Sequence, residues 1–395
     1  MHCLNNHKLS ETFETKFGKK PQLVVRAPGR INLIGEHTDY NNGFVLPAAI
    51  DKAIVFAVAK SGTNTFQFYA ADLDDEFIFG SNDLRVNEEK RWANYLIGVI
   101  AQFEKEGYVV PPLQIVFGGN IPLGAGLSSS AAVECGLAYA INALLGFQLS
   151  KVELAHMAQK AEHEFAGVQC GIMDQFASLM GAKEHVIRLD CQTLEYEHFP
   201  FPMDRYQIVL CDTQVKHSLA SSEYNTRRRE CEEGVSLLAS YYPDVKSLRD
   251  VNIAMLEKHK KEMDPIVFDR CQYVVNENIR VLEGCKDLAA GNLEAFGKKM
   301  YASHEGLSNR YVVSCSELDF LVEQTQDKPY VLGARMMGGG FGGCTINLVK
   351  VQDIQQFELE MKEAYKRQFN VDLITYKVAI EDGVGLLPDF METQP

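Results

Sequence analysis

The chain has 395 residues and a formal net charge of −14; 46% of its residues are hydrophobic and 23% are charged. Nucleic acids and anionic membranes bind basic surfaces, so this acidic balance argues against both as partners. The sequence contains no uncharged apolar stretch of the roughly 18 residues that a membrane span requires. The length suits a globular protein of two domains.

Ten cysteines are scattered along the chain without a Cys-x-x-Cys pair or zinc-like spacing. This pattern is typical of reduced cytosolic thiols that serve as small core residues. The first twenty residues are polar and contain no apolar segment of a signal peptide. We therefore expect a cytoplasmic protein, and we expect a monomer.

Hydrophobic periodicity predicts short strands and amphipathic helices in the first part of the chain. The predicted strands cover residues 22–27, 44–60 and 113–117, and the predicted helices cover 92–103, about 130–145 and 150–167. Gly146 is a typical C-terminal stop for the second helix. Ser150 and Glu153 form a capping box at the start of the third.

The second part of the chain changes from strands to helices and back to strands. Residues 183–210 are β-rich, 221–326 are mostly helical, and the end contains predicted strands at 331–337, 344–350 and 373–380 with a helix at 354–367. This order predicts an α+β fold. We place the division between an N-terminal domain, 1–185, and a C-terminal domain, 186–395.

The segment from Pro28 to Pro47 concentrates hydrogen-bonding side chains within an otherwise apolar stretch. These side chains are Arg30, Asn32, Glu36, His37, Asp39, Tyr40 and Asn41. The hydroxyl groups of a small polar ligand need placed partners of this kind, and charged partners make the stronger hydrogen bonds. The segment therefore predicts a binding site for such a ligand.

The run Gly124-Ala-Gly-Leu-Ser-Ser-Ser130 lies between a predicted strand and a predicted helix. Its glycines let the backbone approach a ligand, and the free amides at a helix start attract anions. The three serine hydroxyls could cap the helix, bind phosphate or hold Mg²⁺, and a serine-capped helix after a glycine turn explains the run equally well. The Walker pattern fails, because no lysine follows the glycines.

A second glycine-rich run, Gly338-Gly-Gly-Phe-Gly-Gly343, matches Gly-x-Gly-x-x-Gly formally. A dinucleotide site needs a helix after the glycines, whereas a strand is predicted here. This argues against an oxidoreductase. We interpret the run as a tight turn whose backbone approaches a ligand or another loop, with a plain hairpin as the alternative.

Two carboxylates are candidates for chemistry. Asp174 lies among apolar residues and needs a nearby cation, for which Arg30 is the natural candidate; a helix N-terminal cap is the alternative. Glu162 could join a serine oxygen and a nucleotide phosphate around Mg²⁺, although a solvated helix face also explains it. Core packing and ligand contact both remain open for three aromatic residues, Trp92, Tyr95 and Tyr224.

Three blocks, Gly29–Pro47, Pro122–Ala131 and Gly333–Thr345, resemble the motifs of the GHMP small-molecule kinase family in order and spacing. Within that family, Glu36–Asn41 and Cys170–Gln175 resemble the galactokinase branch. The resemblance implies a two-domain GHMP kinase fold with its active site in the cleft between the domains. It also implies ATP-dependent phosphorylation of the C1 hydroxyl of α-D-galactose, with Mg²⁺ as cofactor.

The resemblance implies a role for each matching position. Asp174 looks like the catalytic carboxylate that takes the hydroxyl proton, and Arg30 looks like its partner. The positions similar to sugar-binding residues are Glu36, His37, Thr38, Asp39, Gly171 and Tyr224. The positions similar to ATP-binding residues are Gly124, Ala125, Gly126, Leu127, Ser128, Ser129 and Ser130, with Trp92 and Tyr95 lining the adenine pocket. Ser130 and Glu162 look like the Mg²⁺ ligands.

Two related functions differ from this one at few positions. Kinases of N-acetylgalactosamine tend to carry Ile in place of Thr38 and an extra glycine before the Met-Asp pair, so this sequence is more similar to kinases of unsubstituted galactose. Non-catalytic sensors of galactose and ATP have a damaged phosphate loop, whereas Ser129, Ser130 and Ala131 are intact here.

Overall fold

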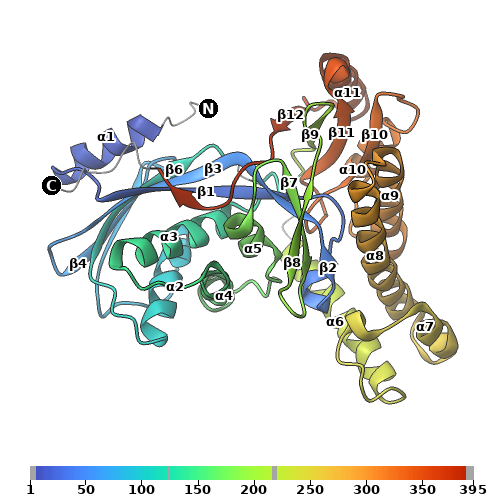
Figure 1. The fold of residues 1–395 in the computed structure, drawn as a ribbon, viewed down its shortest axis with the longest axis horizontal. Helices are drawn as coiled ribbons and strands as arrows, with labels where there is room; N and C mark the ends of the chain where they lie inside the picture. The colour runs from blue at the N-terminus through green and yellow to red at the C-terminus, as the bar shows by residue number, and fades with distance from the viewer. Residues whose placement is uncertain (1–5, 123, 216–219, 388–395) are drawn as a thin grey trace.

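The computed structural model describes residues 6–122, 124–215 and 220–387 and arranges them in two lobes (Figure 1). The first lobe contains a six-stranded sheet in the order β13-β1-β3-β6-β4-β5. Its strands are β1 (Leu23–Asn32), β3 (Pro47–Lys60), β4 (Thr65–Ala70), β5 (Asp75–Gly80), β6 (Leu113–Gly119) and β13 (Gly385–Leu386). Neighbouring strands are antiparallel except β4 and β6, which run parallel.

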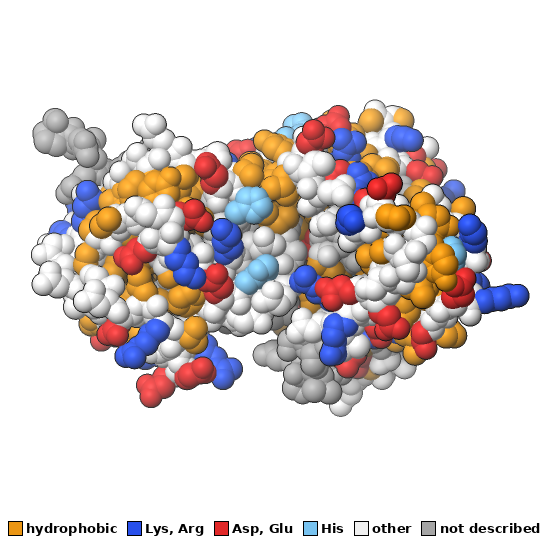
Figure 2. Space-filling view, turned by 90° about the horizontal axis from the view of Figure 1, so that it is seen from below, with side chains coloured by type: hydrophobic (Ala, Val, Ile, Leu, Met, Phe, Trp, Pro, Cys, Tyr) orange, Lys and Arg blue, Asp and Glu red, His pale blue; other side chains and the backbone are white. Residues whose placement is uncertain are grey.

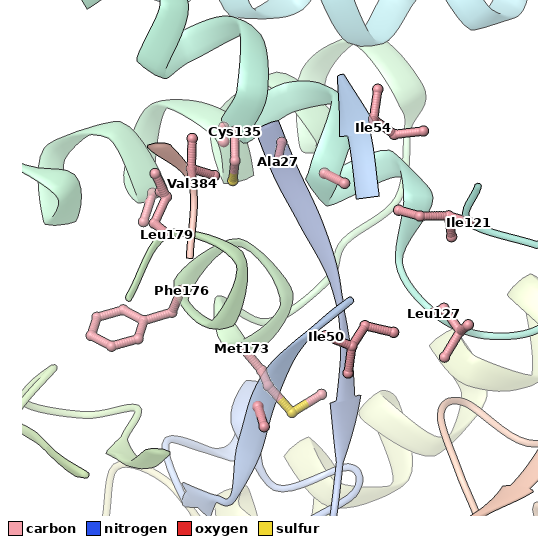
Figure 3. Close-up of a cluster of buried hydrophobic side chains, with 14 of the residues drawn as sticks. Ala27, Ile50, Ile54, Ile121, Leu127, Cys135, Met173, Phe176, Leu179 and Val384 are labelled. Carbon is pink, nitrogen blue, oxygen red and sulfur yellow. The ribbon is translucent and has the colours of Figure 1, made fainter. Parts of the chain in front are cut away.

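Helices cover both faces of this sheet. One face carries α2 (Arg91–Lys105), α3 (Ser129–Leu145), α4 (Lys151–Ala161), the π-helix η2 (Glu162–Ala166) and α5 (Met173–Met180). On the opposite face, α1 (Asn6–Phe17) packs Leu9 and Phe13 against Val24 and Val116 (Figure 1). In Figure 3, Met173 and Phe176 of α5 belong to the same buried cluster as Ala27 of β1. This packing fixes α5 beside the sheet.

A three-stranded sheet lies between the two lobes (Figure 1), with strands in the order β2-β7-β8. Its strands are β2 (Phe44–Val45), β7 (His185–Asp190) and β8 (Tyr196–Pro200). The second lobe contains an antiparallel sheet in the order β10-β11-β9-β12. Its strands are β9 (Tyr206–Asp212), β10 (Val331–Met336), β11 (Cys344–Lys350) and β12 (Ile374–Val378).

The remaining helices belong to the second lobe and its junction with the first. They are α6 (Ala220–Ala239), α7 (Ile253–His259), α8 (Pro265–Ala289), α9 (Leu293–Gly306), α10 (Ser316–Glu323), α11 (Ile354–Phe369) and the π-helix η5 (Leu307–Tyr311). Short 3-10 helices are η1 (Asp39–Asn41), η3 (Leu248–Asp250), η4 (Lys260–Glu262) and η6 (Val351–Asp353). None of the helices in the described part of the chain has the length and apolar character needed to cross a bilayer. On the face shown in Figure 2, positive and negative side chains are interspersed over both lobes.

The elements predicted from periodicity are confirmed, with shifts of a few residues at their ends. Gly146 ends α3 in a left-handed conformation, and Ser150 with Glu153 forms the expected capping box of α4. The hairpin of β10 and β11, the helix α11 and the strand β12 follow the predicted order. The division at residue 185 stays a prediction. Strand β7 begins at this division and β8 follows it; β7 pairs with β2 of the N-terminal part and with β8, and β13 returns to pair with β1.

Candidate active site

A cavity of about 300 Å³ lies where the end of β1, the start of α5 and the start of α6 face the glycine-rich turn after β10. Segments of both lobes line it. Among the residues lining it are eight of the predicted site residues: Arg30, Glu36, His37, Asp39, Glu162, Gly171, Asp174 and Tyr224. Residues far apart in the sequence therefore meet in one pocket.

Arg30 and Asp174 form a bidentate ion pair at the wall of this cavity. The Nε–Oδ1 distance is 2.7 Å and the Nη2–Oδ2 distance is 2.8 Å. Burial disfavours charge on Arg30, but the surrounding carboxyl groups, Asp174 above all, together outweigh this effect and raise the pKa of the guanidinium. The N-cap of α5 is Ile172, and Asp174 lies in the first turn. The alternative of a helix cap is thus wrong, and the predicted pairing is confirmed.

The loop before α3 borders the same pair. Ser128 adopts a left-handed conformation, makes no side-chain cap to α3, and donates its hydroxyl to Asp174 instead. Arg30 donates to the carbonyl of Gly126 through its side chain and to that of Leu127 through its backbone amide. Leu127 is buried, and Figure 3 shows it at the edge of the apolar cluster. A serine-capped helix is therefore not what this loop forms. Within the described ranges the first amides of α3 have no recorded acceptor, and such amides attract anions.

Glu162 is 7% exposed and lines the cavity, so the alternative of a solvated helix face is wrong. Its carboxylate is hydrogen-bonded to Ser130 and accepts from Gln175 Nε2 at 2.7 Å. Burial raises the pKa of Glu162, and the nearby Asp174 adds to the effect. A carboxylate and a hydroxyl supply the oxygen donors that suit Mg²⁺. In the described ranges no group of three or more His, Cys, Asp or Glu side chains could hold a metal ion.

Two groups of the second lobe hold the carboxylate of Glu36. Its Oε1 accepts from Arg335 Nη2 at 2.8 Å and from the backbone amide of Gly338 at 2.7 Å. Burial alone would raise the pKa of Glu36, but Arg335, Arg30 and the Gly338 amide together outweigh it, and the pKa is lowered. This carboxyl group is therefore ionised and oriented before any ligand binds.

His37, Asp39 and Gly171 form the adjoining wall. Burial lowers the pKa of His37 to about 4, so its imidazole is neutral at physiological pH. Burial, with the neighbouring Asp174 carboxylate, raises the pKa of Asp39 to about 7. A Cβ atom at Gly171 would lie 2.0 Å from Asp39 Oδ2, so only glycine leaves Asp39 in this position.

The predicted loop from Gly124 to Ser130 and three other predicted contacts, Thr38, Trp92 and Tyr95, do not line the cavity. Thr38 is fully buried behind it, and its hydroxyl donates to the carbonyls of Gly35 and Phe44 at 2.8 and 2.6 Å. The Thr38 hydroxyl is thus committed to the turn that presents its neighbours, which corrects the expectation of a direct sugar contact. Trp92 donates to Asp75 and packs beside Phe117. Burial raises the pKa of Tyr95 to about 12, with a contribution from nearby Glu162.

Comparisons with known proteins agree over most of the chain. A family model described as a galactokinase galactose-binding signature matches residues 11–60, and models of the N-terminal and C-terminal domains of GHMP kinases match residues 94–182 and 285–367. A galactokinase of Thermotoga maritima is 44% identical over 92% of this chain and 99% of its own length. One from Roseiflexus sp. is 39% identical over 98% of both chains.

The chain belongs to the galactokinase family.

Solved structures give the same result for the fold. The galactokinase of Lactococcus lactis, solved in complex with galactose, is 33% identical and superposes with a TM-score of 0.92 over 96% of this chain and 99% of its own. The mevalonate kinase of Methanococcus jannaschii is 16% identical with a TM-score of 0.63 over 91% of this chain, which shows a shared fold. This member of the galactokinase family is therefore a kinase with the predicted α+β, two-domain GHMP architecture, and the oxidoreductase alternative is excluded.

Sequence reasoning missed two side chains that shape the pocket of this galactokinase-family chain. Arg335 holds Glu36, and Gln175 joins Glu162 to the buried carboxylate of Glu134. A signal for Arg335 was present, since it is a lone charge within the apolar strand β10. The turn at Gly338–Gly340 was expected to approach a ligand or a loop, and it lines the cavity.

Proposed function

We propose that this enzyme transfers the γ-phosphoryl group of ATP to the C1 hydroxyl of α-D-galactose, giving galactose 1-phosphate and ADP. The observation that carries the proposal is the part-buried Arg30–Asp174 pair, which lies in one cavity with the carboxyl groups of Glu36 and Asp39. The galactose complex of the L. lactis relative supports the choice of sugar.

In this proposal Asp174 accepts the proton of the C1 hydroxyl, whose oxygen forms the new bond to the γ-phosphorus. The bond from that phosphorus to the bridging oxygen breaks, and ADP leaves with the electron pair. Phosphoryl transfer depends mainly on alignment and on neutralising charge at the γ-phosphoryl oxygens. Arg30 supplies positive charge beside the acceptor, and its bond to Gly126 keeps the phosphate loop next to Asp174.

The sugar would be held by Glu36, His37, Asp39, Gly171 and Tyr224. Two observations support these roles: Glu36 is fixed by Arg335 and Gly338, and the buried His37 Nε2 has no hydrogen-bond partner among the described residues. A buried polar atom without a partner is costly, and a ligand hydroxyl would satisfy it. Thr38 supports this wall from behind and does not touch the sugar in this arrangement.

The ATP phosphates would lie at the loop Gly124, Ala125, Gly126, Leu127, Ser128, Ser129 and Ser130, where the free amides of α3 begin. Ser130 and Glu162 would hold Mg²⁺, which neutralises phosphate charge when bound. Trp92 and Tyr95 stay predicted neighbours of the adenine. The monomeric state and the cytoplasmic location also stay predictions.

The test is a panel of free hexoses, including galactose, glucose and N-acetylgalactosamine, each incubated with ATP and Mg²⁺. We expect ADP release with galactose in preference to the other sugars, and phosphorus NMR should place the new ester on C1. Preferred turnover of N-acetylgalactosamine, or ATP binding without turnover of any sugar, would contradict the proposal in favour of the two related functions.

A further inference from the structure

A chain of hydrogen bonds leads away from the cavity behind His37. Its Nδ1 lies 2.8 Å from the hydroxyl of Tyr40, which lies 2.7 Å from the hydroxyl of Tyr311. The Tyr311 hydroxyl in turn lies 3.2 Å from the sulfur of Cys231. Tyr311 and Cys231 are completely buried. The chain thus connects the first lobe with η5 and α6 through side chains outside the proposed chemistry.

The other side of the His37 ring faces the cavity. Its Nε2 is buried and makes no hydrogen bond of good geometry with the described residues, although the backbone of Gly339 approaches the ring. The residue is held firmly, because its backbone is left-handed with φ 63° and its carbonyl accepts from Asn41 Nδ2 at 2.9 Å. A neutral imidazole carries one proton. Whichever nitrogen carries it decides whether Nε2 offers a ligand a donor or an acceptor.

The protons of the hydrogen-bond chain allow few arrangements. Each of its three contacts needs one proton. If both buried hydroxyls also spend their protons within the chain, the donors all point either toward His37 or toward Cys231. Imidazole nitrogen is a better acceptor than a phenol oxygen, and a thiol is a weak donor and a weak acceptor. Donation from Tyr40 to Nδ1 therefore makes the stronger bond at His37.

A further contact anchors the other end of the chain. The Asn41 side chain also hydrogen-bonds the Cys231 sulfur, as Tyr311 does. If Tyr40 donates to His37, Tyr311 must donate to Tyr40, and the thiol then donates to Tyr311. The backbone of Gly339 also interacts with the His37 ring and favours a proton on it.

We propose that Tyr40 and Tyr311 are positioning residues that fix His37 with its proton on Nε2, so that His37 donates a hydrogen bond to one hydroxyl oxygen of the sugar. The inference rests on the proposed function, because it assigns a direction to one contact of the sugar site. Neither tyrosine touches the reacting atoms in this view; both act through the imidazole.

The kinetic test uses Tyr40→Phe and Tyr311→Phe, with Tyr301→Phe as the control. Tyr301 is a part-buried tyrosine whose hydroxyl bonds Thr325 outside the site. KM is measured for galactose and for its 2-, 3-, 4- and 6-deoxy analogues. We expect both site variants to raise KM for galactose about tenfold, the equivalent of one hydrogen bond. One of the deoxy sugars lacks the hydroxyl group that His37 binds. In the site variants, the ratio of KM for that sugar to KM for galactose should fall toward unity. Unchanged ratios in both site variants would overturn the inference.

A second readout needs no substrate. Nitrogen NMR of enzyme labelled with ¹⁵N-histidine reports which ring nitrogen carries the proton, and a His37→Gln variant identifies the signals of His37. We expect a bare Nδ1 and a protonated Nε2 in the wild type, with a shift of the proton toward Nδ1 in Tyr40→Phe. A proton on Nδ1 in the wild type would overturn the inference even if galactose is the substrate. Failure to phosphorylate galactose would instead overturn the proposed function and leave this spectrum interpretable.

Discussion

Arg335 and Glu36 form an ion pair that is completely buried between the two lobes, with 2.8 Å between Nη2 and Oε1. The same guanidinium donates to the carbonyls of Asn32 and Leu33 at 2.7 and 2.6 Å. It therefore joins β10 of the second lobe to the end of β1 in the first. The orientation of Glu36 in the cavity depends on a residue almost 300 positions away.

Replacing this arginine, in Arg335→Met, should destabilise the protein by about 3–5 kcal/mol, because it leaves the Glu36 charge buried without its partner. KM for galactose should also rise, since Glu36 loses its orientation. Urea unfolding and steady-state kinetics measure the two effects. The control is Arg310→Met, which breaks an exposed pair with Asp269 and should cost at most about 1 kcal/mol. Equal losses in the two variants would show that Arg335 has no special role.

Asp174→Ala should lower kcat by about 10²–10⁴-fold, the usual contribution of a general base, while calorimetry still detects galactose binding. Asp174→Asn keeps the shape of the side chain and should lose turnover to a similar extent. Asp372→Ala removes an exposed carboxylate that pairs with Lys366 and should leave kcat unchanged. Near-normal turnover in both Asp174 variants would rule out the assigned role.

Much of the fold was predictable because its signals are local. Periodicity, the capping box at Ser150 and the glycine stop at Gly146 each depend on a few adjacent residues, and the structure confirms them. The pairing of Arg30 with Asp174 was predictable for a different reason. A carboxylate among apolar residues requires a cation, and the polar block contains a single arginine.

Other features could not be read from the sequence because they depend on contacts between distant segments. The sugar-site motif contains Thr38, but the turn from Gly35 to Phe44 uses its hydroxyl, and no local pattern reveals that competition. The return of β13 to β1 is equally hidden, since two residues carry no periodicity. The partners of Tyr311 come from two other elements, η1 and α6.

Galactose binding should depend on pH through Asp39, whose pKa is raised to about 7. Above that pH the carboxylate is ionised and accepts stronger hydrogen bonds from sugar hydroxyls. KM for galactose at saturating ATP should therefore fall as the pH rises from about 6 to about 8. In Asp39→Asn this change should vanish. An equally steep profile in the variant would assign the titration to another group.

Ionisation of Asp39 should also make the stability of the fold depend on pH. Stability should fall as the pH rises, whereas galactose binding should improve. Folded Asp39 keeps its proton to a higher pH than the unfolded chain does, so its contribution to stability falls as the pH rises from about 4 to about 7. His37 opposes this trend, because its lowered pKa makes stability rise with pH between about 4 and 6.5. The difference in Tm between Asp39→Asn and the wild type isolates the carboxyl group, and it should shift in favour of the variant between about pH 5 and pH 8.

Gly171→Ala should weaken galactose binding, because the added Cβ would lie 2.0 Å from Asp39 Oδ2 and must displace that carboxylate. We expect KM for galactose to rise about tenfold or more, as when a hydrogen bond to a charged group is lost, with a smaller effect on KM for ATP. Gly80→Ala is a matched control, because nothing lies within 4 Å of a Cβ atom there. A variant that binds galactose normally would show that Asp39 can move without cost.

Glu162→Gln tests the proposed magnesium site, and Glu164→Gln in the same π-helix is the control. Glu162 lines the cavity beside Ser130, whereas Glu164 points to the surface and pairs with Lys105 and Gln102. The amide keeps the shape and the bond to Gln175 but weakens coordination of a hard cation. The Mg²⁺ concentration for half-maximal turnover should rise about tenfold or more, since even indirect partners of a metal ligand contribute on this scale.

Calorimetric titration of Mg²⁺ with ADP should show the same loss without turnover, while Glu164→Gln should match the wild type in both measurements. If the two variants have the same Mg²⁺ requirement, the ion is held elsewhere.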